Sequence, residues 1–241
     1  MVVLILWIGI TLPGEWLQAG KTTSLDRLVS EGIVYALVLA LLFLVIVIAY
    51  FKWWPWVGLR VPDRWGDLRL LWLPLLAVIL LMMFVEASGL PEGETLWFIL
   101  INTLIIGCSE VLMFNGIMFL GASFKFGWRR AVWITALTYG VTQGLNELIT
   151  GDIRAAFLQA GLAVLFGVWM VALRLRLNTI IPLIILHWLW DFGVISLRVQ
   201  GGVTTIMGAG LPILFAVLLF LYGLWLLEGY HASMRENLLA R

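Results

Sequence analysis

The sequence predicts an all-α fold, a polytopic transmembrane helix bundle of about eight spans. Hydrophobic residues make up 63% of the 241 residues and charged residues 12%, whereas soluble domains average about 45–50% and about 25%. Most of the chain lies in apolar segments that approach or reach the roughly 20 residues needed to cross a bilayer. Many of the fourteen Trp residues lie near the ends of these segments, where their amphipathic rings favour the headgroup region.

Eight apolar segments are predicted to be helices, separated by short stretches that contain Gly and Pro. Their ranges are 1–13, 32–51, 70–87, 96–120, 131–148, 155–173, 179–197 and 206–228. The first segment is short, but it begins without a basic residue and ends at a poor cleavage site. A retained helix is therefore favoured over a signal peptide. Since no strong repeat or low-complexity linker divides the chain, one membrane domain is expected.

The distribution of basic residues predicts the orientation of the bundle. Eleven Lys and Arg residues fall in the loops 52–69, 121–130 and 174–178 and in the tail from 229, whereas the opposite loops hold four. Cytoplasmic loops are enriched in Lys and Arg, so both termini are expected in the cytoplasm. The minimal loops, without an evident transit segment, favour a bacterial cytoplasmic membrane.

Charge and cysteine content exclude other classes. The formal net charge is +1. The sequence has no polybasic run of the kind that binds nucleic acid or anionic lipid. The lipid bilayer itself is the expected partner, and no nucleic acid is expected. The single cysteine, Cys108, cannot form an internal disulfide.

Few polar side chains fall deep within the predicted spans. Glu110 lies in the fourth span and Gln143 in the fifth, while His187 and Asp191 are four residues apart on one face of the seventh. Counted from the cytoplasmic helix ends at about 1.5 Å per residue, all four fall roughly 12–18 Å deep. Because an ionisable group in the membrane costs several kcal/mol unless it is paired or faces water, this shared level predicts a functional site.

The segments that carry these residues resemble a known family. EVLMFNG (110–116), YGVTQ (139–143) and LQAGLAVLFGVWMVALRLRLNTIIPLIILHWLWD (158–191) are similar to the CPBP family of CAAX proteases and bacteriocin-processing (Abi) enzymes, which are glutamic-type intramembrane peptidases. The family pattern is Glu-Glu-x-x-x-Arg, Phe-x-x-x-His and His-x-x-x-Asn/Asp. The resemblance implies a CPBP-like core at 96–197, preceded by N-terminal transmembrane helices at 1–95 and followed by a C-terminal helix and tail at 198–241.

The resemblance assigns roles to the four polar residues and also shows departures. Glu110 matches the first motif glutamate, which activates water, and His187 with Asp191 matches the pair that holds the oxyanion. Val111 replaces the second glutamate, Asn115 replaces the arginine, and Gln143 replaces the second-motif histidine. Since an amide cannot carry a proton, and a lost acid–base partner costs about 10²–10⁴ in rate, impaired or altered proteolysis is expected.

Other interpretations of the same residues remain open. Glu110 can be read as a protonated core carboxyl, His187 and Asp191 as an intrahelical pair, and Gln143 as a polar contact between helices. A metal site of Glu110, His187 and Asp191 is disfavoured because it has one histidine. The alternative function is a non-catalytic membrane subunit that binds another membrane protein, a lipid or a lipophilic pigment. No cofactor is predicted, although a lipophilic ligand stays open.

Overall fold

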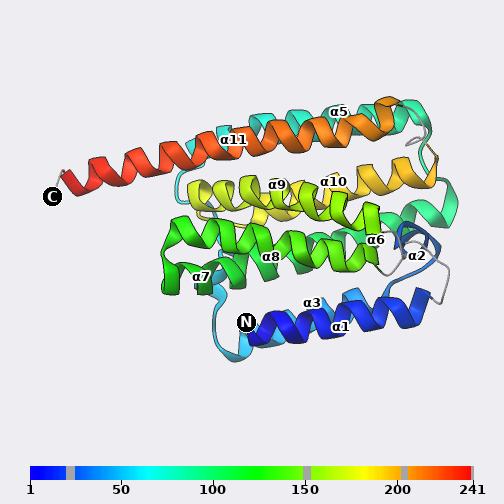
Figure 1. The fold of residues 1–241 in the computed structure, drawn as a ribbon, viewed down its shortest axis with the longest axis horizontal. Helices are drawn as coiled ribbons and strands as arrows, with labels where there is room; N and C mark the ends of the chain where they lie inside the picture. The colour runs from blue at the N-terminus through cyan, green and yellow to red at the C-terminus, as the bar shows by residue number, and fades with distance from the viewer. Residues whose placement is uncertain (20–24, 149–152, 202–205, 240–241) are drawn as a thin grey trace.

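The computed structural model describes residues 1–19, 25–148, 153–201 and 206–239, and in these ranges every regular element is helical. The helices run along one long axis, with α1 and α3 side by side at one edge of the bundle and α5 and α11 at the opposite edge (Figure 1). The elements in chain order are α1 (Val2–Ala19), α2 (Leu25–Glu31), α3 (Tyr35–Tyr50), α4 (Trp54–Val57), the 3-10 helix η1 (Trp65–Leu71), α5 (Trp72–Ser88), α6 (Gly93–Glu110), the π-helix η2 (Val111–Met118), α7 (Phe119–Phe126), α8 (Trp128–Leu148), α9 (Ile153–Leu177), α10 (Ile181–Val199) and α11 (Ile206–Leu239).

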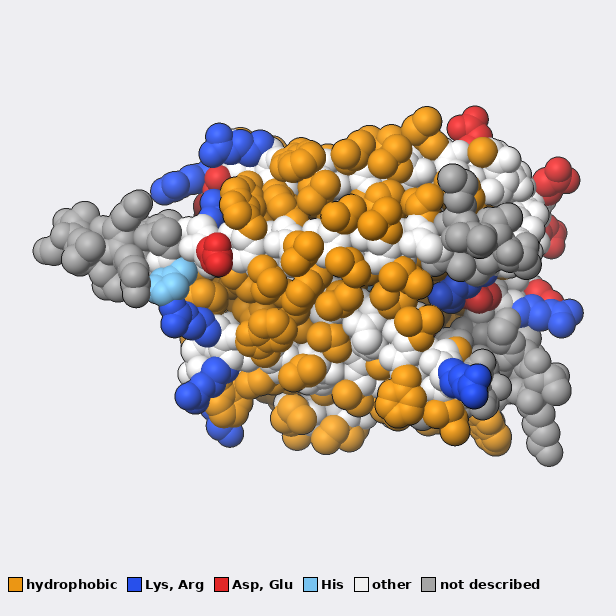
Figure 2. Space-filling view, turned by 45° about the horizontal axis from the view of Figure 1, so that its top comes forward, with side chains coloured by type: hydrophobic (Ala, Val, Ile, Leu, Met, Phe, Trp, Pro, Cys, Tyr) orange, Lys and Arg blue, Asp and Glu red, His pale blue; other side chains and the backbone are white. Residues whose placement is uncertain are grey.

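The predicted class, an all-α transmembrane bundle, is confirmed. Five helical segments are long and apolar enough to cross a membrane, and α1 and α3 are shorter apolar helices. Figure 2 shows hydrophobic side chains covering the middle of one face, with charged side chains gathered at its two ends. The count of eight spans stays a prediction, because α1 and α3 are short and α8 contains several polar residues. The five segments are Trp65–Ser88, Gly93–Phe126, Ile153–Leu177, Ile181–Val199 and Gly210–His231.

Several helix boundaries differ from those expected. The first helix continues to Ala19 instead of ending at residue 13, with Pro13 and Gly14 inside it. Gly14 lies against α3, where a Cβ atom at this position would be 2.6 Å from the Cβ of Ala36. Gly14 therefore serves close packing here, although a Pro-Gly pair usually marks the end of a helix. The short elements α2, α4 and η1 were not anticipated, and α11 extends beyond residue 228.

The centre of the bundle is α9, which packs between α8 and α11. Glycine residues allow both α8 and α11 to approach α9 closely. A Cβ at Gly223 would lie 2.7 Å from the Cα of Trp169, and a Cβ at Gly140 would lie 2.7 Å from the carbonyl oxygen of Ala160. Gly144 also packs on Ala160. Gly140 and Gly144 are four residues apart on α8 and form a small-residue face of the kind that brings membrane helices together.

This packing gives a first prediction. Gly140→Ala is expected to lower the free energy of unfolding by about 1–3 kcal/mol, because the new methyl group meets the α9 backbone. Gly161→Ala on α9 is the matched control, since a Cβ there meets nothing within 4 Å, and it should be neutral or stabilise the helix slightly. Unfolding in mixed micelles, followed by Trp fluorescence, measures both changes. Equal stability of the two variants would contradict this account of the α8–α9 contact.

Candidate active site

The four polar residues of the sequence analysis meet in the interior of the bundle. Glu110 lies at the end of α6, Gln143 on α8, and His187 and Asp191 on α10. The side-chain amide of Gln143 donates to both carboxylate oxygens of Glu110, at 2.8 Å each. The Nε2 atom of His187 lies 3.4 Å from Glu110 Oε2 and 3.2 Å from Asp191 Oδ2. Glu110 is 7% exposed and His187 3% exposed, so three helices converge on one buried polar cluster.

The backbone changes its helix type immediately after Glu110. Residues Val111–Met118 form the π-helix η2, between α6 and α7. Wider helical turns of this kind are rare and often occur at functional sites. Val111 and Asn115, which stand where the family has Glu and Arg, are both buried in η2. The segment is also close to α4, since a Cβ at Gly116 would lie 3.3 Å from the Cβ of Val57.

A close contact between α6 and α10 brings Glu110 near His187. Gly107 lies one turn before Glu110, and a Cβ there would be 3.0 Å from the backbone nitrogen of Trp188. The indole of Trp188 donates to the carbonyl oxygen of Leu100 on α6, at 3.0 Å. The small residue and the hydrogen bond together fix the separation and register of these two helices at the level of the site.

The start of α10 is held by a polar turn at one end of the bundle. Asn178 has a left-handed backbone conformation, with φ 55°, which Asn tolerates better than most residues. Its side chain donates to Asp63 at 2.6 Å and accepts from Arg174 at 3.0 Å. Its carbonyl oxygen accepts from Arg60 at 3.0 Å. These contacts join the loop before η1 to the α9–α10 turn, and so they fix where α10 and His187 begin.

Aromatic rings enclose the cluster on one side. The ring of Phe166 on α9 meets His187 edge-on, with ring centres 5.2 Å apart, and Tyr139 meets it at 6.2 Å. Tyr139 also packs edge-on against Phe114 of η2, at 4.9 Å. These rings exclude bulk water from one face of the imidazole and strengthen polar interactions there.

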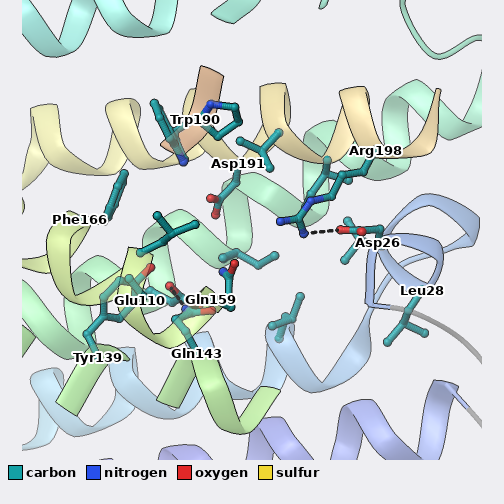
Figure 3. Close-up of a pocket in the computed structure, with 18 of the residues that line it drawn as sticks. Asp26, Leu28, Glu110, Tyr139, Gln143, Gln159, Phe166, Trp190, Asp191 and Arg198 are labelled. Carbon is teal, nitrogen blue, oxygen red and sulfur yellow. Dashed lines mark hydrogen bonds and ion pairs between the residues drawn. The ribbon is translucent and has the colours of Figure 1, made fainter. Parts of the chain in front are cut away.

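On its other side the cluster faces a cavity of about 180 Å³. Figure 3 shows Glu110, Gln143 and Asp191 at this cavity, with Tyr139 and Phe166 beside them and the ion pair of Asp26 and Arg198 farther along it. The nitrogen and oxygen atoms of this pair are 3.3 Å apart. The walls contain many apolar side chains from α2, α3, α9, α10 and α11. The cavity therefore offers a polar end at Glu110 and an apolar path toward the helix ends.

Glu15 also lines this cavity, although the sequence did not indicate it as a site residue. Its side chain is 5% exposed although it was expected in a loop after the first helix. The spacing of Trp7, Thr11 and Glu15 places them on one helix face, and that periodicity is the signal that would have revealed it. Gln159 on α9 is a second cavity residue that was not singled out. Two further polar residues follow Gln143 on α8, Asn146 and Glu147, and their side chains lie outside the described residues.

The described residues contain no group of three or more His, Cys, Asp or Glu side chains arranged to hold a metal ion. The contacts of Glu110, Gln143, His187 and Asp191 are instead those of a compact acid, amide and imidazole cluster. Such a cluster next to a cavity can position a water molecule beside a carboxylate and offer an N–H group to a developing negative charge.

The bundle contains a buried acid and a buried imidazole beside a cavity. This arrangement is typical of membrane proteins that have a reaction or binding site within the membrane. Residues 92–193 match the family described as Rce1-like, type II CAAX prenyl endopeptidase. This segment is therefore similar to the CPBP family, and the predicted resemblance is confirmed. It contains Glu110, Gln143, His187 and Asp191. No curated protein and no solved structure matches the chain.

Proposed function

We propose that the protein is a CPBP-type intramembrane peptidase whose proteolysis is slowed or altered by the replacements in its motifs. The observation that carries this proposal is the contact of Glu110 with both Gln143 and His187, made by three helices within the family segment. Each buried polar group costs free energy in a membrane unless it has a partner, and here Glu110 and Gln143 also line a cavity. The cavity beside the cluster favours a reaction site over a purely structural contact.

Each residue has a distinct role in the proposed reaction. Glu110 takes a proton from a water molecule in the cavity, whose oxygen attacks the peptide carbonyl carbon. Gln143 holds the carboxylate of Glu110 through its two hydrogen bonds. The Nε2 atom of His187, which lies 3.4 Å from Glu110 and 3.2 Å from Asp191, donates its N–H to the oxyanion when that charge forms. Gln143 orients the base but cannot carry a proton, which accounts for a reduced rate.

The family description and the cavity suggest the substrate class. The family description that matches residues 92–193 names a type II CAAX prenyl endopeptidase. The apolar walls of the cavity and its polar end at Glu110 suit a peptide that carries a lipid. We therefore propose a lipidated or membrane-embedded peptide as the substrate, with the scissile bond at Glu110 and the apolar group along the walls.

The replacements also favour a second candidate function. Val111, Asn115 and Gln143 remove two charges and a proton carrier from the family pattern, while the apolar cavity is retained. A non-catalytic subunit that binds a lipid, a lipophilic pigment or another membrane protein would keep the cavity and not need the chemistry. Mass analysis of the protein purified in gentle detergent would support this function by showing a bound lipophilic molecule or partner.

The location of the protein is inferred from the distribution of its basic residues. The excess of basic residues in one set of loops supports cytoplasmic termini, and we propose the bacterial cytoplasmic membrane. In that orientation the part of the cavity at Asp26 and Arg198 lies toward the non-cytoplasmic face, because both residues are at the helix ends opposite the basic loops.

Cleavage of a defined peptide tests the proposed function. The protein is reconstituted in liposomes with a farnesylated peptide that ends in Cys-a-a-X, and products are followed by liquid chromatography and mass spectrometry. We expect a shortened lipidated peptide to accumulate with time, and much less product from the same peptide without the farnesyl group. Empty liposomes are the control. Failure to cleave the farnesylated peptide, together with a copurified lipophilic molecule, would favour the binding function instead.

A further inference from the structure

The carboxyl group of Glu15 faces the same cavity as Glu110 but comes from a different part of the chain. Glu15 lies on α1, outside the family segment, and is 5% exposed. It lines the cavity, and its Oε2 atom has no hydrogen-bond partner. An unpaired negative charge in such a place costs several kcal/mol. The neutral acid is therefore the favoured form of Glu15, which leaves an O–H group available to the cavity.

Two contacts fix α1 against the site. The indole of Trp7 donates to the hydroxyl of Ser109 at 2.9 Å, and both side chains are buried. Ser109 directly precedes Glu110, so this bond ties α1 to the end of α6. On another side, Gly14 packs against Ala36 of α3. The position of Glu15 is thus set by its helix neighbours and does not depend on a loop.

The leaving group of the proposed reaction needs a proton donor, and a donor other than Glu110 would let the protonated Glu110 stay with the attacking oxygen. Peptide cleavage releases an amine, whose nitrogen needs a proton as the C–N bond breaks. Gln143 stands where the family has a histidine and cannot supply it. Asp191 and Glu110 both contact Nε2 of His187, and Arg198, the cation at the far part of the cavity, is paired with Asp26. Glu15 is the remaining buried acid of the described cavity wall.

We propose that Glu15 is the second catalytic carboxyl of this site and protonates the departing amine; this inference rests on the proposed peptidase function. Glu110 takes one proton from water, and the resulting hydroxide oxygen forms a bond to the carbonyl carbon. The C–N bond then breaks, and its electron pair takes the proton from the carboxyl group of Glu15. The proton on Glu110 returns to Glu15 through cavity water. The net reaction adds OH to the acyl fragment and H to the amine.

A change of leaving group separates this role from a structural one. Two farnesylated Cys-a-a-X peptides are compared, one with the normal amide and one with a thioester at the bond that the wild-type protein cleaves. A thiolate leaves without being protonated, since thiols ionise near pH ~8.5. We expect Glu15→Gln to slow amide cleavage by about 10²-fold and thioester cleavage by less than about 3-fold. Glu86→Gln, at an exposed position outside the cavity, should leave both rates unchanged.

The ratio of the amide rate to the thioester rate tests the role of Glu15, because this ratio does not depend on how much of each variant is folded. A Glu15→Gln variant with the wild-type ratio, whether its rates are unchanged or equally reduced, would overturn the role as proton donor. Glu110→Gln should lose cleavage of both peptides. If Glu110→Gln instead cleaves both at the wild-type rate, the proposed peptidase function itself fails, and that failure is distinguishable from a result confined to Glu15.

Discussion

Replacing Glu110 by Gln is expected to reduce peptide cleavage by about 10⁴-fold, the upper range for the loss of a general base. Gln has nearly the size and shape of Glu, so it fits the same space at the end of α6. It can still form hydrogen bonds with Gln143 and His187, but it cannot take a proton from water. The loss should therefore appear in the rate of cleavage under single-turnover conditions, while binding of the lipidated peptide changes little.

Glu94→Gln is the matched control for this variant. Glu94 lies on the same helix, α6, and is exposed in its first turn. We expect its cleavage rate and its thermal stability to equal those of the wild type. Thermal unfolding followed by Trp fluorescence should also show that Glu110→Gln is folded. Wild-type cleavage by Glu110→Gln would mean that the carboxylate contacts of Gln143 and His187 are structural.

Replacing Asn102 by Leu is expected to lower the free energy of unfolding by about 3–5 kcal/mol. The side chain of Asn102 on α6 is fully buried and connects three backbone groups of the α2–α3 turn. It accepts from the backbone N–H of Val34 at 3.0 Å and donates to the carbonyl oxygens of Val29 and Gly32 at 2.9 and 2.7 Å. Leu fills a similar volume but leaves these groups without their partner, in an interior that water does not reach.

Gln18→Ala supplies the comparison, because Gln18 contacts the same turn from the surface. Its amide donates to the carbonyl oxygen of Ile33 at 2.7 Å and accepts from the N–H of Tyr35 at 3.0 Å, in an exposed position. Water replaces these bonds, so the cost should be below about 1 kcal/mol. Denaturant titration in mixed micelles compares the two variants. Similar losses for both would show that burial does not set the strength of the Asn102 contacts.

The helices themselves could be predicted from the sequence, since long apolar runs have few alternatives in a bilayer. All eight predicted segments overlap helices of the structure. The meeting of Glu110, Gln143 and His187 could also be anticipated from their similar depths, because a buried polar group in a membrane needs a partner. Depth along a helix was enough to group these residues, although it could not give their distances.

Depth did not group Glu15 with these residues, because the predicted first helix ends at residue 13. Pro13 and Gly14 usually end a helix, and the sequence does not show that Gly14 packs against Ala36. The π-helix after Glu110 and the hydrogen bonds of Asn178 also depend on contacts between distant segments. The local sequence determines helix propensity. The end of α1, the π-helix and the contacts of Asn178 are instead determined by residues of other helices or loops that pack against them.

Cleavage in water enriched in ¹⁸O tests the central claim, hydrolysis at Glu110, most directly. The wild-type protein in liposomes is given the farnesylated Cys-a-a-X peptide, and the new C-terminal carboxyl group is analysed by mass spectrometry. The account predicts a shortened peptide whose new carboxyl group carries one ¹⁸O atom, formed by the wild type and not by Glu110→Gln. No shortened peptide from the wild type, or equal formation of the labelled product by Glu110→Gln, would contradict it.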